Sequence, residues 1–288
     1  MQQCHILTRP SNHINSFPDN LLLIWPVIFL TSLPPNGQHA TISSVIRDIW
    51  TGLINLVYPR LCIACRQSLP DTKPSDPLCP ACRHRIQLNR PPFCRQCGRP
   101  ITSFRRIYCP PCQLEILPFD RAWSATIYDE TMRHLIHLFK YGNKTALRHT
   151  WAEILTEFIS SYHLPIKDFD LLVPVPLHRS RLRQRGYNQA DLLTNIIARQ
   201  YQIPSTNQII FRCRNTQNQA RLSPKERWTN LQGAFKIKKS SSLINKNILI
   251  IDDLLTTGAT TSGMASLLKQ AGAAHVSLLT LAVTPRSK

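Results

Sequence analysis

The chain has 288 residues, of which 43% are hydrophobic and 18% are charged. This length and composition exclude a disordered chain and leave room for one α/β domain together with a smaller module. Lys and Arg number 35 against 16 Asp and Glu, which gives a net charge of +19. Such a charge favours a polyanionic ligand, either nucleic acid or a phosphorylated small molecule, although a role in solubility alone is the alternative.

Residues 1–44 are expected to form a poorly structured extension. A start codon assigned upstream of the true one would account for it. The longest apolar run, at 20–30, has eleven residues and contains Pro26. It is too short for the roughly 30 Å hydrocarbon layer of a membrane, and it lacks the basic flank and small-residue cleavage site of a secretory signal. We therefore expect no stable membrane span and a cytoplasmic protein, and a short membrane-associating segment is the alternative.

The composition changes twice along the rest of the chain. Residues 42–58 place apolar side chains on one helical face, and Pro59 ends this predicted helix. Between residues 60 and 112, Pro, Cys and Arg replace the apolar runs, which return from residue 119 onward. These changes predict an extension at 1–44, a leading helix and cysteine-rich module at 45–116, and an α/β domain at 117–288.

The last of these regions alternates strands with helices. Strands are predicted at 122–128, 169–177, 207–213, 247–251 and 275–282, and helices at 130–142, 146–162, 188–202 and 260–271. This alternation predicts an α/β fold with a mainly parallel sheet and helical crossovers.

Eight of the ten cysteines form four C-x-x-C pairs. A two-residue gap lets both thiolates face one tetrahedral ion at about 2.3 Å, so two pairs complete a Cys4 zinc site and four pairs complete two. Four disulfides are the alternative, but the absence of a convincing secretory signal favours metal. Pairing in sequence order is the simplest arrangement, and cross-bracing is the alternative. The predicted ligands are Cys62, Cys65, Cys79, Cys82, Cys94, Cys97, Cys109 and Cys112.

The cysteine-rich module is also rich in arginine. Phe93, Phe104 and Tyr108 are interleaved with these arginines. Such a composition is typical of surfaces that follow a phosphate backbone and stack bases. A solvated basic surface is the alternative.

Residues 248–260 read ILIIDDLLTTGAT. The uninterrupted apolar run predicts a central parallel strand, and ligands of such sheets bind at the carboxyl ends of the strands. The loop that follows precedes a helix, so its N–H groups are suited to hold a phosphate. Because carboxylates repel a phosphate, Asp252 and Asp253 instead suit the vicinal hydroxyls of a sugar phosphate. An acidic helix cap is the alternative.

Further candidates surround the strand at 169–177. That strand ends in the stiff turn PVPL, which is suited to contact a pyrophosphate if its amides face inward. Four arginines follow at 179–185. Each guanidinium is able to bind two phosphate oxygens, and a second basic run lies at 221–227. A solvated face is the alternative for such runs. The candidates for contacts to pyrophosphate or nucleic acid are Pro174, Val175, Arg183, Arg185, Asn188, Gln189 and Lys140.

Residues 248–260 resemble the phosphoribosyl-pyrophosphate motif of type I phosphoribosyltransferases: four apolar residues, two acids, two variable residues and T-T-G-x-T. The resemblance implies that the acids bind the ribose hydroxyls, that the loop binds the 5′-phosphate, and that Mg²⁺ accompanies the pyrophosphate. The implied contacts are Asp252, Asp253, Thr256, Thr257, Gly258, Ala259 and Thr260.

The resemblance widens to the ComF competence family, also called GntX-like, from about residue 50 to the end. It rests on the C-x-x-C pairs and on the segments at 138–142, 172–190 and 216–235, with Tyr187 in place of a usual Phe and Asn218 where Pro is common. It implies a small N-terminal double zinc ribbon, with two structural zinc ions, before a type I phosphoribosyltransferase-like domain. It further implies a cytoplasmic protein that binds phosphoribosyl pyrophosphate and single-stranded DNA in natural transformation, with DNA-uptake machinery or a helicase as partner. The alternative function is an active transferase that displaces pyrophosphate onto an unknown acceptor.

Overall fold

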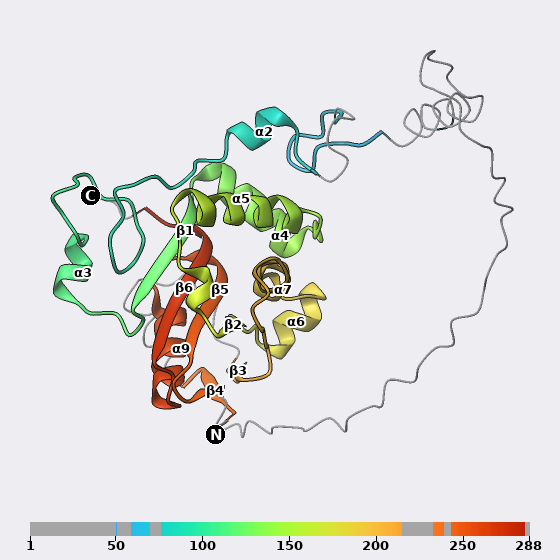
Figure 1. The fold of residues 1–288 in the computed structure, drawn as a ribbon. Helices are drawn as coiled ribbons and strands as arrows, with labels where there is room; N and C mark the ends of the chain where they lie inside the picture. Colours follow the sequence, from blue (N-terminus) through green and yellow to red (C-terminus); the bar gives the residue numbers. More distant parts are fainter. Residues whose placement is uncertain (1–49, 51–58, 70–75, 215–232, 239–242, 286–288) are drawn as a thin grey trace, which may run out of the picture. The chain divides into compact units, whose positions relative to one another are not determined.

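The computed structural model describes residues 50, 59–69, 76–214, 233–238 and 243–285. The chain divides into two compact units, Met1–Pro59 and Arg60–Lys288, and the fold below is that of the second (Figure 1). The predicted extension at 1–44, the basic run at 221–227 and, apart from Trp50, the predicted helix at 42–58 lie outside the described residues. Within the described ranges, we find no helix with the length and apolarity that a membrane crossing requires.

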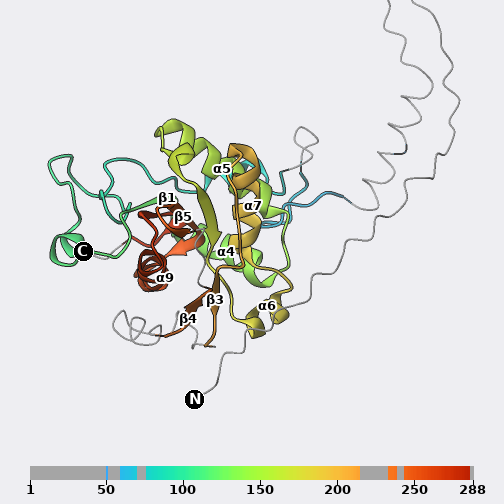
Figure 2. The same cartoon turned by 60° about the horizontal axis from the view of Figure 1, so that its bottom comes forward.

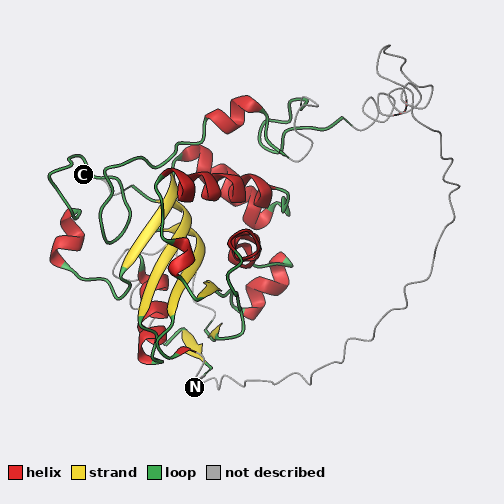
Figure 3. Cartoon of the chain, viewed as in Figure 1, coloured by secondary structure: helices red, strands yellow, loops and turns green. Residues whose placement is uncertain are grey.

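Four parallel strands form the central sheet. They are β1 (Arg121–Ile127), β2 (Leu171–Pro174), β5 (Asn247–Leu255) and β6 (His275–Val283). Their order is β1-β6-β5-β2, and every neighbouring pair is parallel. The central strands β5 and β6 are rich in Ile, Leu and Val, as suits strands buried on both faces. The predicted α/β fold with a parallel sheet is confirmed (Figure 3).

Helices cover both faces of this sheet. α4 (Glu130–Tyr141), α5 (Leu147–Ser161) and α7 (Gln189–Tyr201) lie on one face, and α9 (Ala259–Gln270) lies on the other (Figure 2). A short 3-10 helix, η1 (Ile166–Asp168), precedes β2. Successive side chains of β5 point to opposite faces of the sheet. Leu249 and Ile251 pack in the core beneath α4, α5 and α7, whereas Ile248 and Ile250 pack in the core beneath α9.

Several elements differ from the predicted set. The strand predicted at 207–213 is reduced to β3 (Ile210–Arg212), which pairs antiparallel with β4 (Phe235–Ile237) in a separate two-stranded sheet. The apolar pattern of a short strand does not specify its partner, so sequence alone assigned it to the parallel sheet. The arginine run after β2 forms an unpredicted helix, α6 (Arg179–Arg185), which His178 caps and which ends at Gly186 with a φ of +78°.

The strand β5 is longer than the sequence predicts. Sequence ends it at Ile251, but β6 continues to pair with it as far as Leu255, which lies opposite Val283. On the other side β2 stops at Pro174, opposite Ile251. The two aspartates therefore stand on the strand itself, beyond the end of β2, rather than in a loop after it.

The cysteine-rich module follows the outer edge of β1. It contains two short helices, α2 (Pro80–His84) and α3 (Pro110–Leu114), and each begins directly after a cysteine. The segment at 87–96 runs beside β1, where the amide of Asn89 donates to the carbonyl of Ala125 at 2.8 Å and the amide of Ala122 donates to the carbonyl of Gln96 at 2.7 Å. The module therefore covers a sheet edge that would otherwise expose unpaired backbone groups. The predicted domain boundary between residues 116 and 117 stays a prediction.

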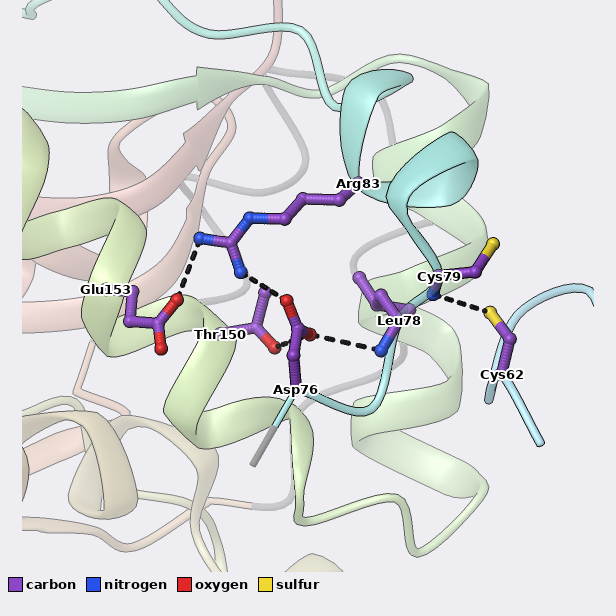
Figure 4. Close-up of polar contacts among 7 residues, drawn as sticks. All are labelled: Cys62, Asp76, Leu78, Cys79, Arg83, Thr150 and Glu153. Atoms are coloured by element: carbon purple, nitrogen blue, oxygen red, sulfur yellow. Dashed lines mark hydrogen bonds and ion pairs between the residues drawn. The ribbon is translucent and has the colours of Figure 1, made fainter. Parts of the chain in front are cut away.

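A buried carboxylate holds the first half of the module against α5 (Figure 4). Asp76 is 8% exposed, and its Oδ1 accepts hydrogen bonds at 3.1 Å from the amide of Leu78 and from the hydroxyl of Thr150. Its Oδ2 lies 2.5 Å from Arg83, which also reaches Glu153 of α5 at 2.8 Å. Donors on both oxygens offset the cost of burying this charge.

Candidate functional site

The eight predicted metal ligands form two clusters in sequence order. Within each cluster all four sulfur atoms lie within 4.8 Å of one another, and Cys65–Cys79 and Cys97–Cys109 are each separated by 3.6 Å. A tetrahedral ion with bonds of about 2.3 Å places its sulfur ligands about 3.8 Å apart. Both clusters therefore fit a structural zinc ion, and none of these eight thiols forms a disulfide. The clusters are Cys62, Cys65, Cys79 and Cys82, and Cys94, Cys97, Cys109 and Cys112.

A cavity of about 650 Å³ lies at the carboxyl ends of the parallel strands. Its wall includes Tyr128 after β1, Val175 after β2, Leu255 at the end of β5 and Thr284 after β6. Helices α4, α6, α7 and α9 contribute the rest, together with β3. This is the position at which open parallel sheets bind their ligands. A second hollow, of about 910 Å³ beside α5, is lined in part by Asp76 and Arg83, whose charges already pair with each other.

An acid pair and a lysine occupy one wall of the cavity. The amide of Asp253 donates to Oδ1 of Asp252 at 2.9 Å, and Lys140 Nζ lies 2.5 Å from Oδ2 of Asp253. Burial, and then the charge of Asp253, raises the pKa of Asp252 well above its ordinary value of 3.8. Burial alone would lower the pKa of Lys140, but the carboxylate of Asp253 outweighs it, so that the pKa is raised. Lys140 thus keeps its charge and neutralises part of the acid pair.

The loop between β5 and α9 lines the same cavity as the acid pair. Gly258 is the N-cap of α9 with a φ of +86°, and no side chain caps the helix. The N-cap residue therefore offers no side-chain oxygen to the first N–H groups of α9. Thr257 engages one of them, since its hydroxyl accepts from the amide of Ala259 at 3.4 Å. An uncapped helix N-terminus of this kind suits a bound anion.

The arginines of α6 divide between two faces of the helix. Arg181 and Arg185, four residues apart, line the cavity, whereas Arg179 and Arg183 are exposed outside its wall. Arg185 donates to Tyr141 Oη and to Gln189 Oε1, both at 2.9 Å. This pattern places two arginines on the wall of the cavity and two toward solvent.

Arg212 of β3 adds a further cation to the wall. It is 8% exposed, and its guanidinium lies 5.6 Å from the ring centre of Phe235. Burial, and then the charge of Arg181, lowers its pKa to about 10. Arg212 therefore remains charged at neutral pH, and an anion in the cavity would relieve its repulsion with the arginines of α6.

The turn after β2 does not offer the amide of Val175 to the cavity. The amide of Val175 donates to the carbonyl of Ile251 at 3.0 Å, within the sheet, and its carbonyl accepts from Asn188 at 3.0 Å. The N–H of Val175 is therefore not available to a pyrophosphate, and a contact of this turn to pyrophosphate stays a prediction. Gln189 is 2% exposed, and among the described residues its Nε2 has no hydrogen-bond partner. A buried amide donor of this kind on a cavity wall suits a ligand oxygen.

The cavity brings together most of the residues chosen from sequence. Thr257, Ala259, Pro174 and Arg183 do not belong to its wall. Arg181 was missed, although its spacing of four from Arg185 was the available signal. Arg212 was missed because no pattern links a three-residue strand to a distant helix. The predicted residues that line the cavity are Lys140, Val175, Arg185, Asn188, Gln189, Asp252, Asp253, Thr256, Gly258 and Thr260.

The aromatic residues of the cysteine-rich module separate into core and surface. Phe93 packs against Phe158 and Tyr162 at ring distances of 5.9 and 5.2 Å, so it is a core residue rather than a stacking platform. Phe104 is 82% exposed and Tyr108 is 37% exposed. The surface that the sequence suggests for stacking bases is therefore limited to the latter pair.

Comparison with known proteins bears on both parts of the chain. The model of the double zinc ribbon domain matches residues 53–113, and that of the phosphoribosyl transferase domain matches residues 193–288. Competence protein F of Haemophilus influenzae is 31% identical over 231 residues, which cover 77% of this chain and 96% of that protein. The chain belongs to the ComF family.

Other relatives agree with this assignment. The ComF-family chain is 31% identical to the DNA utilization protein YhgH of Salmonella typhi, over 80% of its own length and 99% of the relative. It is also 31% identical to Competence protein ComFC of Bacillus subtilis, over 73% and 85% of the two chains. A solved hypoxanthine phosphoribosyltransferase from Staphylococcus aureus is 19% identical, with a TM-score of 0.29 over 47% of this chain and 64% of that one.

Proposed function

We propose that the cavity binds phosphoribosyl pyrophosphate together with Mg²⁺. The observation that carries this proposal is the meeting of an acid pair, an uncapped helix N-terminus and a cationic wall in one cavity. Carboxylates accept hydrogen bonds from vicinal ribose hydroxyls, while the N–H groups at the start of α9 hold the 5′-phosphate. Arg181, Arg185 and Arg212 then face the pyrophosphate, whose charge Mg²⁺ would share when bound.

The acid pair supports a ligand that brings hydroxyl donors. The raised pKa of Asp252 reflects a carboxylate that is only partly compensated in the ligand-free protein. Hydroxyl groups of a ribose supply the missing donors, whereas a phosphate at the same place would add to the repulsion. In the proposed complex the sugar, and not its phosphate, therefore lies against Asp252 and Asp253.

We propose further that single-stranded DNA follows the outer face of α6. Arg179 and Arg183 are exposed there, and Tyr141, beside Arg185, is 51% exposed at the rim of the cavity. Exposed arginines with an accessible aromatic ring suit a sequence-tolerant contact to single strands. The names of the relatives, competence and DNA utilization proteins, support a role in DNA uptake and natural transformation. That role implies a cytoplasmic protein that works with the uptake machinery or a helicase.

An active phosphoribosyltransferase is the second candidate. Tyr128, His137 and Tyr141 line the cavity, and aromatic side chains suit a planar acceptor beside the ribose. In such a reaction the bond between ribose C1 and pyrophosphate breaks, and a nucleophile of the acceptor forms the new bond to C1. The arginines would stabilise the departing pyrophosphate by position and charge, without a dedicated base.

Calorimetric titration of the zinc-loaded protein with phosphoribosyl pyrophosphate and Mg²⁺ tests the first proposal, with D252N as the control that should not bind. Pyrophosphate release is then measured on the same sample with and without single-stranded DNA. Binding with release identifies a transferase, and binding without release identifies a protein that uses the sugar phosphate as a ligand. No binding by the wild-type protein would refute the proposed site.

The two faces of α6 provide a test for DNA. Fluorescence anisotropy of a labelled oligonucleotide should show affinity falling steeply with salt, and R183M should reduce the salt slope by about one. R181M, on the cavity face, should weaken phosphoribosyl pyrophosphate binding by about tenfold or more. Binding of DNA that is insensitive to salt and to R183M would contradict the proposed surface.

A further inference from the structure

Arg99 of the cysteine-rich module extends into the phosphoribosyltransferase-like part of the chain. It is only 2% exposed. Its Nε donates to the carbonyl of Thr284 at 3.0 Å, and its Nη2 donates to the carbonyl of Thr256. Thr256 opens the loop before α9, and Thr284 follows β6. Both threonines line the cavity, so one guanidinium holds two segments of its wall together.

The second cysteine cluster fixes the backbone of Arg99. The amide of Cys94 donates to the carbonyl of Arg99 at 2.8 Å, and the amide of Gly98 donates to the carbonyl of Cys94 at 2.9 Å. Gly98 has a φ of +67°, and a Cβ there would meet the carbonyl oxygen of Ala122 at 2.5 Å. The start of the Arg99 side chain is therefore held between the cluster and β1.

The first cysteine cluster has the same turn without this contact. The amide of Cys62 donates to the carbonyl of Gln67 at 2.8 Å, and Arg66 has a φ of +63°, as Gly98 has at the matching position of the second turn. Gln67, which corresponds to Arg99, is exposed. The turn itself thus does not require a buried arginine. The hydrogen bonds of Arg99 instead hold the segments that contain Thr256 and Thr284.

The contact determines which way a peptide group of the loop faces. The C=O of Thr256 and the N–H of Thr257 point in opposite directions, because the peptide unit is planar and trans. Arg99 holds this C=O and is not part of the cavity wall, so the following N–H is directed away from Arg99. Were the peptide to turn over, the carbonyl of Thr256 would lose this donor, and Thr256, which lines the cavity, would be held in another orientation.

We propose that Arg99 is a positioning residue through which the second cysteine cluster orders the phosphate-binding loop. This inference rests on the proposed sugar-phosphate site. Arg99 does not touch the ligand; it sets the orientation of the loop that does. The second zinc ribbon then supports the binding site from outside its wall, whereas the first half of the module packs against α5.

Three variants of the full-length, zinc-loaded protein test the proposal. R99M removes both hydrogen bonds, and R99K keeps the charge but does not reach two carbonyls with a planar fork. R95M is the matched control, because Arg95 lies in the same turn between Cys94 and Cys97 and its side chain is exposed. Zinc content is measured for each variant, to establish that both clusters remain loaded.

Hydrogen exchange of residues 255–261 in the absence of ligand is the first readout. R99M should speed exchange in this segment by about tenfold or more, with R99K between R99M and wild type and R95M unchanged. Calorimetric affinity for phosphoribosyl pyrophosphate with Mg²⁺ is the second readout, and R99M should lower it by about tenfold to a hundredfold. Exchange in the first ribbon should not change.

Several results would overturn the proposal. Loop exchange and affinity that stay at wild-type values in R99M would show that Arg99 does not order the loop. If R99M loses zinc, R99K decides: a loss of zinc there as well, or exchange that rises throughout the protein, would make Arg99 a folding residue only. If the wild-type protein binds no sugar phosphate, the proposed function fails, but the exchange experiment still decides whether Arg99 orders the loop.

Discussion

The buried ion pair between Lys140 and Asp253 gives a sharp prediction for the variant K140M. The two charges lie 2.5 Å apart, and their side chains are 21% and 9% exposed. Methionine keeps much of the length of the lysine side chain but leaves the carboxylate of Asp253 buried beside Asp252 without its partner. Removing one member of a buried pair costs roughly 3–5 kcal/mol. Because Lys140 retains some exposure, we expect the lower end, about 3 kcal/mol.

Thermal unfolding of the ligand-free, zinc-loaded protein measures this cost. For a domain of 150–250 residues, a loss of about 3 kcal/mol lowers Tm by roughly 6–12 °C. The deficit should be large at pH 8 and smaller at pH 5, because an unpaired buried carboxyl has a raised pKa and is neutralised by a proton as the pH falls. K140M/D253N removes the unpaired charge and should recover most of the loss.

An exposed pair at the same distance provides the control. Lys269 and Asp120 are also 2.5 Å apart, but their side chains are 35% and 37% exposed. K269M should therefore cost only about 0–1 kcal/mol. If K140M melts within about 2 °C of wild type at pH 8, or if K140M/D253N melts no higher than K140M, the buried pair does not stabilise the site as we argue.

Three further predictions concern stability and ligand affinity. The pKa of Asp252 is raised above its ordinary value of 3.8. The contribution of this carboxyl group to the stability of the folded state is therefore fully present below pH 3.8 and is lost as the pH rises through the folded-state pKa. D252N should consequently raise the Tm of the ligand-free protein at pH 8 but not at pH 4. The same variant should lose about a hundredfold or more in calorimetric affinity for phosphoribosyl pyrophosphate while its zinc content stays at wild type, and retained affinity would remove Asp252 from the site. G98A should lower Tm much more than G186A. Both glycines have positive φ, but only at Gly98 would an added Cβ meet backbone, 2.5 Å from the carbonyl oxygen of Ala122. G186A should cost about 1 kcal/mol of stability and so measures the penalty of the positive φ alone.

The sequence predicts the elements of this protein better than their partners. The apolar run before Asp252 indicates a central strand because it lacks the alternation of a half-exposed one, and C-x-x-C spacing indicates zinc because two thiolates on one turn suit a tetrahedral ion. Both inferences depend on neighbours in the chain. The separate pairing of β3 with β4 was not predictable, since the three residues of Ile210–Arg212 do not indicate which strand pairs with them.

The sequence by itself determined the parallel α/β fold, the four C-x-x-C pairs as metal ligands, and the acid pair followed by a Thr-Gly loop, because each depends on spacing, periodicity and residue type over short distances. The structure decided that the pairs combine in sequence order. Only the tertiary structure decided that Lys140 pairs with Asp253, that Arg181 rather than Arg183 lines the cavity, and that Arg99 holds the carbonyl of Thr256 from 157 positions away. Such contacts depend on how elements distant in the chain are packed, and an arginine that binds a carbonyl looks, in a sequence, like any other arginine of a basic surface.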